Sequence, residues 1–124
     1  MFKFIYIGFG GFLGAISRYT ISKWIGTKFE STIPYGTLTV NILGSFVLGF
    51  LMTFIINKTN VSPNIRLALT TGFLGALTTF STYAYETIIL IEDKNYYLAG
   101  FNILSNLLLG LIFVLLGIFL AKAI

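Results

Sequence analysis

Four stretches of this chain are each apolar enough, and close to the right length, to cross a lipid bilayer as a helix. They cover about residues 4–24, 37–56, 65–91 and 97–121, and a spanning helix needs about 20 residues. The connecting segments are short, and Pro34 and Pro63 mark two of the turns. Of the 124 residues 56% are hydrophobic and 10% are charged, a composition that a soluble domain of this length cannot bury. We therefore predict an all-α membrane protein whose single four-helix transmembrane domain covers residues 1–124.

The third stretch is too long for one straight span, and its sequence favours an interruption. Gly72 and Gly75 weaken the helix, and every side chain from Thr78 to Tyr83 except Phe80 carries a hydroxyl that can bond freed backbone groups. We predict a break near residues 75–79. Non-helical backbone at membrane depth is tolerated only inside protein or beside a wet cavity, so this segment should not face lipid.

The residue types that the chain lacks argue against several functions. Cys and His are both absent, which excludes disulfides, thiolate chemistry and imidazole bases or metal ligands. The four carboxylates are scattered and mostly lie in predicted loops, so paired-carboxylate hydrolysis is not expected. The eight basic residues form no run that would bind nucleic acid. We expect neither an enzyme nor a nucleic-acid-binding protein.

The basic residues are almost evenly divided between the two ends of the predicted spans. With the N-terminus inside, the inner ends carry Lys3, Lys58, Arg66 and Lys122, and the outer ends carry Lys23, Lys28 and Lys94, with Arg18 deeper in the first span. The positive-inside rule therefore predicts no preferred orientation of the chain in the membrane. Two copies inserted in opposite directions could pair about a two-fold axis in the membrane plane.

Small and charged residues in the first span have both a packing and a functional interpretation. Gly10 and Gly14 form a GxxxG pair, which predicts close packing against another helix. Arg18 follows one turn later, and a charge inside a span either marks a site or reaches toward the nearby interface.

Polar and aromatic residues in the other spans are expected to converge. They are Asn41 in the second span, Phe80, Tyr83 and Glu86 in the third, and Asn102 and Asn106 in the fourth. Singly, each could serve interhelical packing, and Glu86 could pair with Arg18 or a hydroxyl. Together they offer amide donors, hydroxyls and ring edges, which suit a small ion pathway. The residues alone leave the sign of the ion open, because broken-helix carbonyls could equally bind a cation.

Three segments of the chain resemble the Fluc/CrcB-type fluoride channels, and the resemblance covers nearly the full length. They are GGFLGAISRY (Gly10 to Tyr19), PYGTLTVNILGSFVLG (Pro34 to Gly49) and TTGFLGALTTFSTYAYE (Thr70 to Glu86). The resemblance implies an antiparallel, dual-topology dimer with two pores in the cell membrane. Such a dimer lets fluoride leave passively and lowers its cytoplasmic concentration. We expect a homodimer in lipid, and pairing with a paralogous subunit is left open.

The resemblance also implies roles for individual residues. A structural sodium ion would lie on the two-fold axis, held by the backbone carbonyls of Gly75 and Thr78. Phe80 and Tyr83 would present ring edges to fluoride. The remaining pathway residues implied by the resemblance are Asn41, Thr39, Ser81, Thr82, Glu86, Arg18, Asn102 and Asn106. The family usually has Phe where this chain has Tyr83, so one ring carries an additional hydroxyl.

Two functions from other classes remain as alternatives. Small proton-coupled multidrug exporters have four spans and dual topology, but they depend on a Glu in the first span, where this chain has Arg18. A non-transporting assembly subunit would explain the glycine motif but not the converging polar residues.

Overall fold

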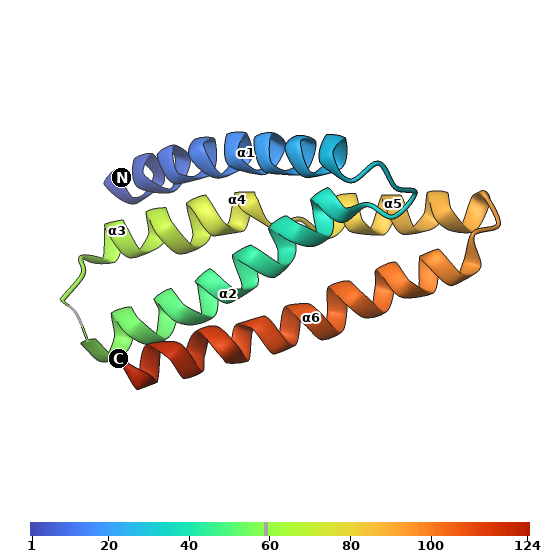
Figure 1. The fold of residues 1–124 in the computed structure, drawn as a ribbon. Coiled ribbons are helices and arrows are strands. Elements are labelled where there is room, and N and C mark those ends of the chain that lie inside the picture. Colours follow the sequence, from blue (N-terminus) through green and yellow to red (C-terminus); the bar gives the residue numbers. More distant parts are fainter. Residues whose placement is uncertain (59) are drawn as a thin grey trace.

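The structure is a computed structural model that describes residues 1–58 and 60–124, and helices dominate it (Figure 1). Three long helices are α1 (Phe2–Lys28), α2 (Tyr35–Lys58) and α6 (Tyr96–Ala123), and each is long and apolar enough to cross a membrane. The remaining segments are α3 (Pro63–Leu67), the π-helical η1 (Ala68–Leu74), α4 (Gly75–Leu77) and α5 (Phe80–Glu92). These four lie end to end and form one interrupted helix (Figure 1). Within the described residues the chain is therefore a bundle of four helices, of which the third is broken.

The interruption lies at Thr78 and Thr79, within the predicted range. Both residues have extended backbone, with φ −84° and ψ 155° at Thr78 and φ −148° and ψ 122° at Thr79. Gly75 itself remains helical. The break therefore begins three residues after the glycine that the sequence highlighted.

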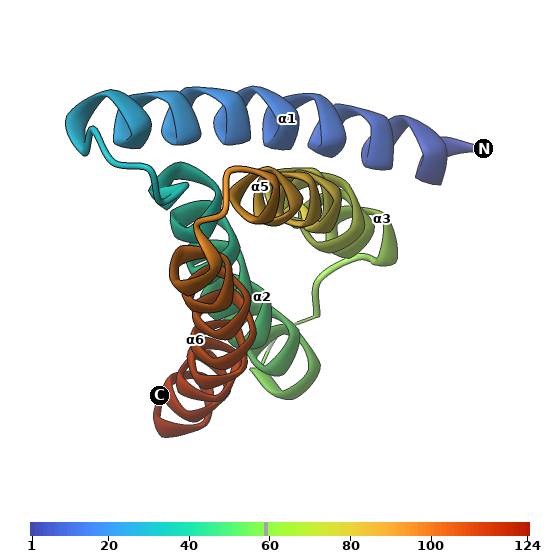
Figure 2. The same ribbon diagram turned by 90° about the vertical axis from the view of Figure 1, so that its right-hand side faces the viewer.

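The two termini lie at one end of the bundle, and the 29–34 loop and the 93–95 turn lie at the other (Figure 1). Viewed end-on, α2 and α6 run side by side, while α1 lies across the opposite side of the interrupted helix (Figure 2). This arrangement puts the break between α2 and α6 on one side and α1 on the other.

Glycines let α1 approach the interrupted helix backbone to backbone. Gly10 and Gly14 are buried, and an added methyl group would overlap the carbonyl oxygens of Ala68 and Phe73, respectively. Gly72 of η1 lies equally close to the backbone of α1. The packing role predicted for the GxxxG pair is confirmed.

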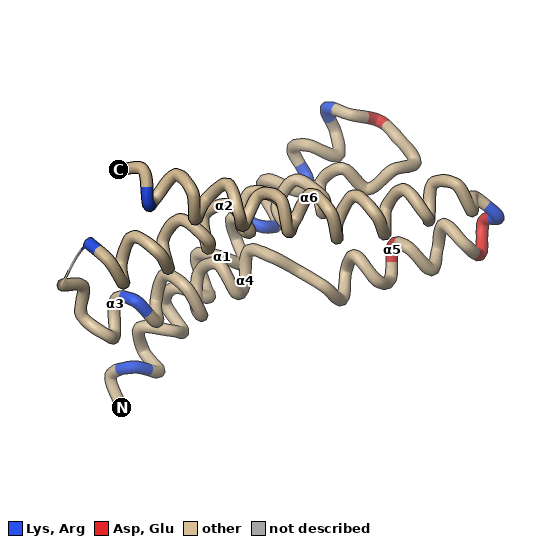
Figure 3. The backbone as a smooth tube through the Cα atoms, turned by 90° about the horizontal axis from the view of Figure 1, so that it is seen from below, with Lys and Arg blue, Asp and Glu red and all other residues tan. Residues whose placement is uncertain are grey.

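The charged residues gather mainly toward the two ends of the bundle, and few lie between them (Figure 3). Lys28 is in the last turn of α1, at one end, whereas Lys58 and Lys122 close α2 and α6 at the other. Apolar side chains such as Phe12, Leu115 and Phe119 are exposed along the helices between these ends. An exposed apolar belt bounded by charges is the surface of a membrane protein.

Candidate functional site

The interrupted backbone is held by one side chain from α2. Asn41 Oδ1 accepts a hydrogen bond from the Thr79 backbone N–H at 2.8 Å, and Asn41 Nδ2 donates to the Thr79 carbonyl at 3.1 Å. The same Nδ2 donates to Asn106 Oδ1 on α6 at 2.9 Å. Backbone groups that leave the helix at membrane depth need such partners, because no water replaces them. Asn41 therefore replaces the partner that the Thr79 N–H loses at the break and adds a second bond to the Thr79 carbonyl.

Thr79 also begins the second half of the helix as its N-cap. Its hydroxyl accepts from the Thr82 N–H at 3.2 Å, donates to Thr82 Oγ1 at 3.1 Å and lies 3.5 Å from Ser81 Oγ. A Thr at this position satisfies one of the free N–H groups of the first turn. Sequence reasoning did not include Thr79 among the site residues, although Thr is one of the residues preferred as an N-cap.

A groove of about 520 Å³ lies between α2, the break and α6, and we call it the ring groove. Its lining includes Asn41, Thr78, Phe80, Tyr83 and Asn106. The Phe80 and Tyr83 rings are neighbours, with centroids 5.5 Å apart and planes inclined by 59°. Phe80 is 79% exposed in the single chain, so its ring has room on its outer side.

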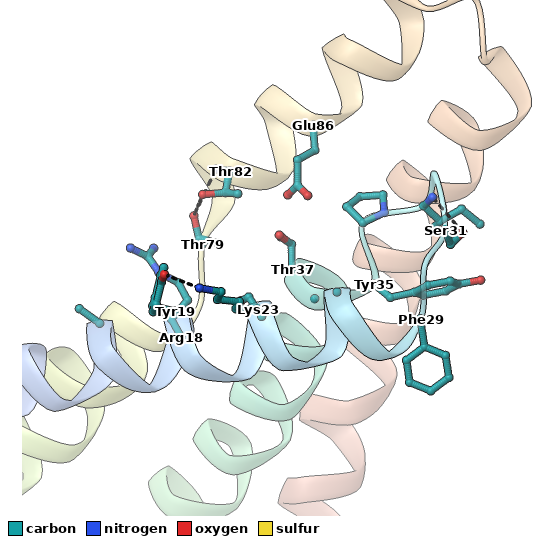
Figure 4. Close-up of a pocket in the computed structure, with 16 residues that line it drawn as sticks. Arg18, Tyr19, Lys23, Phe29, Ser31, Tyr35, Thr37, Thr79, Thr82 and Glu86 are labelled. Carbon is teal, nitrogen blue, oxygen red and sulfur yellow. Dashed lines mark hydrogen bonds between the residues drawn. The ribbon is translucent and has the colours of Figure 1, made fainter.

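A second groove, of about 480 Å³, lies on the other side of the break, and we call it the Glu86 groove (Figure 4). Its lining includes Arg18, Thr37, Thr79, Thr82 and Glu86, and Thr79 lines both grooves. The Thr37 hydroxyl points toward the Glu86 carboxylate (Figure 4). Glu86 Oε1 is buried with no hydrogen-bond partner in the described part of the chain.

Arg18 and Glu86 share this groove without forming an ion pair within residues 1–58 and 60–124. The pairing that the sequence left open is therefore not formed in the single chain. Nearby, Lys23 Nζ donates to the Tyr19 hydroxyl at 3.2 Å and lies 5.4 Å from the ring centroid (Figure 4). The groove thus combines two cations with one carboxylate.

The two grooves contain most, but not all, of the residues expected along the ion pathway. Thr39 lies apart, in a third groove beside Phe46 and Phe113, and its hydroxyl donates to the Tyr35 carbonyl at 2.7 Å. Asn102 is only 1% exposed and lines neither groove. Ser81 is exposed and also lines neither groove, so the single chain brings seven of the ten expected pathway residues to the two grooves and leaves Thr39, Ser81 and Asn102 outside them.

Backbone oxygens at the break are the groups best suited to a cation. In a continuous helix the Thr79 N–H would bond the Gly75 carbonyl, but here it bonds Asn41 instead. The Gly75 carbonyl is thereby left without its usual donor, Gly75 is exposed, and the carbonyl end of a helix carries partial negative charge. The described residues contain no group of three or more Asp, Glu, His or Cys that could hold a metal. The open Gly75 carbonyl therefore fits a cation that takes backbone oxygen ligands.

The fold and the site together define a class of integral membrane protein in which an interrupted helix carries a polar and aromatic site within the bilayer. Residues 5–118 match the family described as CrcB-like protein, Camphor Resistance (CrcB). The chain belongs to this family, which confirms the resemblance found in the three sequence segments.

Close relatives extend over almost the whole chain, and each bears the name fluoride-specific ion channel FluC. The protein from Geotalea uraniireducens (strain Rf4) is 47% identical over 120 residues, which cover 97% of both chains. The protein from Clostridium perfringens (strain 13 / Type A) is 47% identical over 116 residues, 94% of this chain and 91% of the relative. That from Campylobacter fetus subsp. fetus (strain 82-40) is 48% identical over 118 residues, with the same two shares.

Proposed function

We propose that this chain forms a fluoride-selective channel. The observation that carries the proposal is the pair of rings at the start of α5, Phe80 and Tyr83, beside the ring groove. Ring edges carry partial positive charge, and the N-terminus of a helix attracts anions. Neither is a full charge, so a small anion would bind without being trapped, which conduction requires. Relatives named as fluoride-specific channels support the choice of fluoride. Conduction makes and breaks no covalent bond, so the chain is not an enzyme.

The working unit proposed here is an antiparallel dimer. Ser81, Thr82 and Thr71 are exposed in the single chain although they lie within the bundle's length, and lipid would leave their hydroxyls poorly satisfied. A second copy is the simplest cover for them. The even division of basic residues between the two ends supports insertion in both directions. We propose a homodimer, with a paralogous subunit as the alternative partner.

A sodium ion is proposed at the break, bound by the carbonyls of Gly75 and Thr78. The exposure of Gly75 would let the same groups of an opposed second copy approach the ion. When bound, the ion would supply fixed positive charge that holds two carbonyl ends together.

The proposed setting is the cell membrane, where the channel would let fluoride leave the cytoplasm down its gradient. In this arrangement Arg18 and the Glu86 groove would lie on the route between the rings and the aqueous phase. Ser81 and Thr82 would offer hydroxyl donors along that route.

The test is anion efflux from liposomes that contain only the purified chain. Fluoride efflux without chloride efflux is the expected result, and it would also establish a self-sufficient homodimer. Absence of fluoride efflux from well-folded protein would contradict the homodimeric channel, and coexpression with a paralogous subunit would then test the heterodimer. Uptake of a lipophilic cation driven by a pH gradient would instead favour the exporter.

A further inference from the structure

A chain of hydrogen bonds links the two ends of the segment that carries the rings. It starts at the Thr79 N–H, which donates to Asn41, and Asn41 Nδ2 donates to Asn106 Oδ1. Asn106 Nδ2 then donates to Asn102 Oδ1 at 3.1 Å, and Asn102 Nδ2 donates to Thr87 Oγ1 at 2.8 Å. The chain ends where the Thr87 hydroxyl donates to the Tyr83 carbonyl at 2.8 Å. We call this the amide circuit: Thr79, Asn41, Asn106, Asn102, Thr87 and Tyr83.

The amide N–H groups of Asn41 and Asn106 are fully used within the protein. An Asn side chain has two N–H donors. Those of Asn41 go to the Thr79 carbonyl and Asn106, and those of Asn106 go to the carbonyl and the side-chain oxygen of Asn102. No amide proton of these two residues is left for an ion in this arrangement. These N–H donors therefore hold the helices and the break in place.

Both ends of the circuit lie on the first turn of α5. Thr79 immediately precedes Phe80, and the Tyr83 carbonyl belongs to the second ring residue. Its hydrogen bonds run from α2 to α6 and from α6 to α5. They therefore tie the start of α5 to the two helices that form the other walls of the ring groove. A shift of the turn would break at least one of these bonds.

We propose that Asn102 and Thr87 are positioning residues for the Phe80–Tyr83 pair, although neither lines a groove. Asn102 is 1% exposed and Thr87 is 6% exposed, so no ion or second copy could reach either side chain without rearrangement. They act through Asn106 and through the Tyr83 carbonyl. This inference rests on the proposed channel function, because it assigns the rings a role in conduction.

The decisive variant is Thr87→Val, which keeps the size and shape of the side chain and removes only the hydroxyl. It deprives Asn102 of its acceptor and the Tyr83 carbonyl of its side-chain donor, while the helical N–H bond to that carbonyl stays. Thr87→Ser restores the hydroxyl. Ser105→Ala is the matched control, because Ser105 is also buried on α6 but its hydroxyl bonds only the Asn102 carbonyl of its own helix, at 3.3 Å.

Fluoride and chloride efflux per folded dimer are measured for each variant in liposomes. Thr87→Val should lower fluoride flux by about 10-fold or more, the effect typical of residues that orient a site's direct ligands, and should reduce the fluoride-to-chloride ratio. Thr87→Ser and Ser105→Ala should retain flux and ratio. Asn102→Leu should match Thr87→Val, and the double variant should be no worse than either single one.

A merely structural role would lower stability and leave flux per folded dimer and the ion ratio unchanged, which would overturn the inference. Wild-type flux from Thr87→Val would overturn it as well, even if Asn102→Leu failed to fold. If the wild-type protein itself passed no fluoride, the proposed function would fail together with this inference. If the wild-type protein conducts fluoride and Thr87→Val conducts it equally well, the inference fails but the proposed function stands.

Discussion

Replacing Asn41 by Leu should lower the free energy of unfolding more than replacing Asn57, the other asparagine of α2. The substitution puts an apolar side chain of similar size in place of the amide and removes the three hydrogen bonds to Thr79 and Asn106. Hydrogen bonds between membrane helices contribute about 0.6 kcal/mol on average and at most about 1.7, so three of them give about 2 to 5 kcal/mol. The upper part of this range applies here, because Thr79 is 8% exposed and its N–H would have no replacement partner.

The free energy of unfolding is measured by titrating detergent-solubilised protein with sodium dodecyl sulfate and following helix content. Asn57→Leu is the matched control, because Asn57 is exposed near the end of the same helix. Its unfolding free energy should stay within about 0.5 kcal/mol of the wild-type value.

Asn41→Asp separates the contributions of the acceptor and the donors. It keeps the oxygen that receives the Thr79 N–H, but it turns the donor into an oxygen facing the Thr79 carbonyl and Asn106. It should therefore be at least as destabilising as Asn41→Leu. If Asn41→Leu unfolds like the wild-type protein, Asn41 does not hold the break and the reasoning is refuted.

Three further predictions follow from other parts of the structure. Gly14→Ala should lower the unfolding free energy by about 1–3 kcal/mol, since the added methyl overlaps the Phe73 carbonyl. Gly8→Ala, where a methyl would meet nothing within 4 Å, should be neutral or slightly stabilising in the same titration, and equal effects of the two variants would contradict the close approach of α1 to the interrupted helix. Lys94→Gly should raise stability by about 1 kcal/mol, because Lys94 has φ 61° in the left-handed region; an unchanged midpoint would argue against strain there. Glu86→Gln should reduce fluoride efflux from liposomes while leaving the protein folded, and full efflux would remove Glu86 from the proposed pathway.

The fold was largely predictable because its main determinants are local. Hydropathy located the spans, and glycines with a hydroxyl run located the broken one. The position of the break was less predictable, since Thr79 leaves the helix only with the partners that Asn41 supplies from another helix. That pairing joins residues 38 apart in sequence, and no local pattern encodes it.

The placement of individual site residues followed less directly from the sequence, for physical reasons that differ between them. Thr39 is two residues from Asn41, and such positions do not share a helix face, so its separation could have been anticipated. Asn102 does share a face with Asn106, as predicted. The burial of Asn102 depends on how α5 packs over α6, and no local sequence pattern predicts that packing. Thr87 was missed because a Thr in a helix that bonds its own backbone has no distinctive signature.

The interruption of the third helix is a fixed joint rather than a hinge. A hinge needs backbone that can rotate, whereas Thr79 is buried and bonded through its N–H, its carbonyl and its hydroxyl. No glycine occurs between Gly75 and Gly100 to ease a rotation. The bonds at this joint fix the angle between α4 and α5, and they thereby set where the Phe80 ring at the start of α5 stands relative to α2.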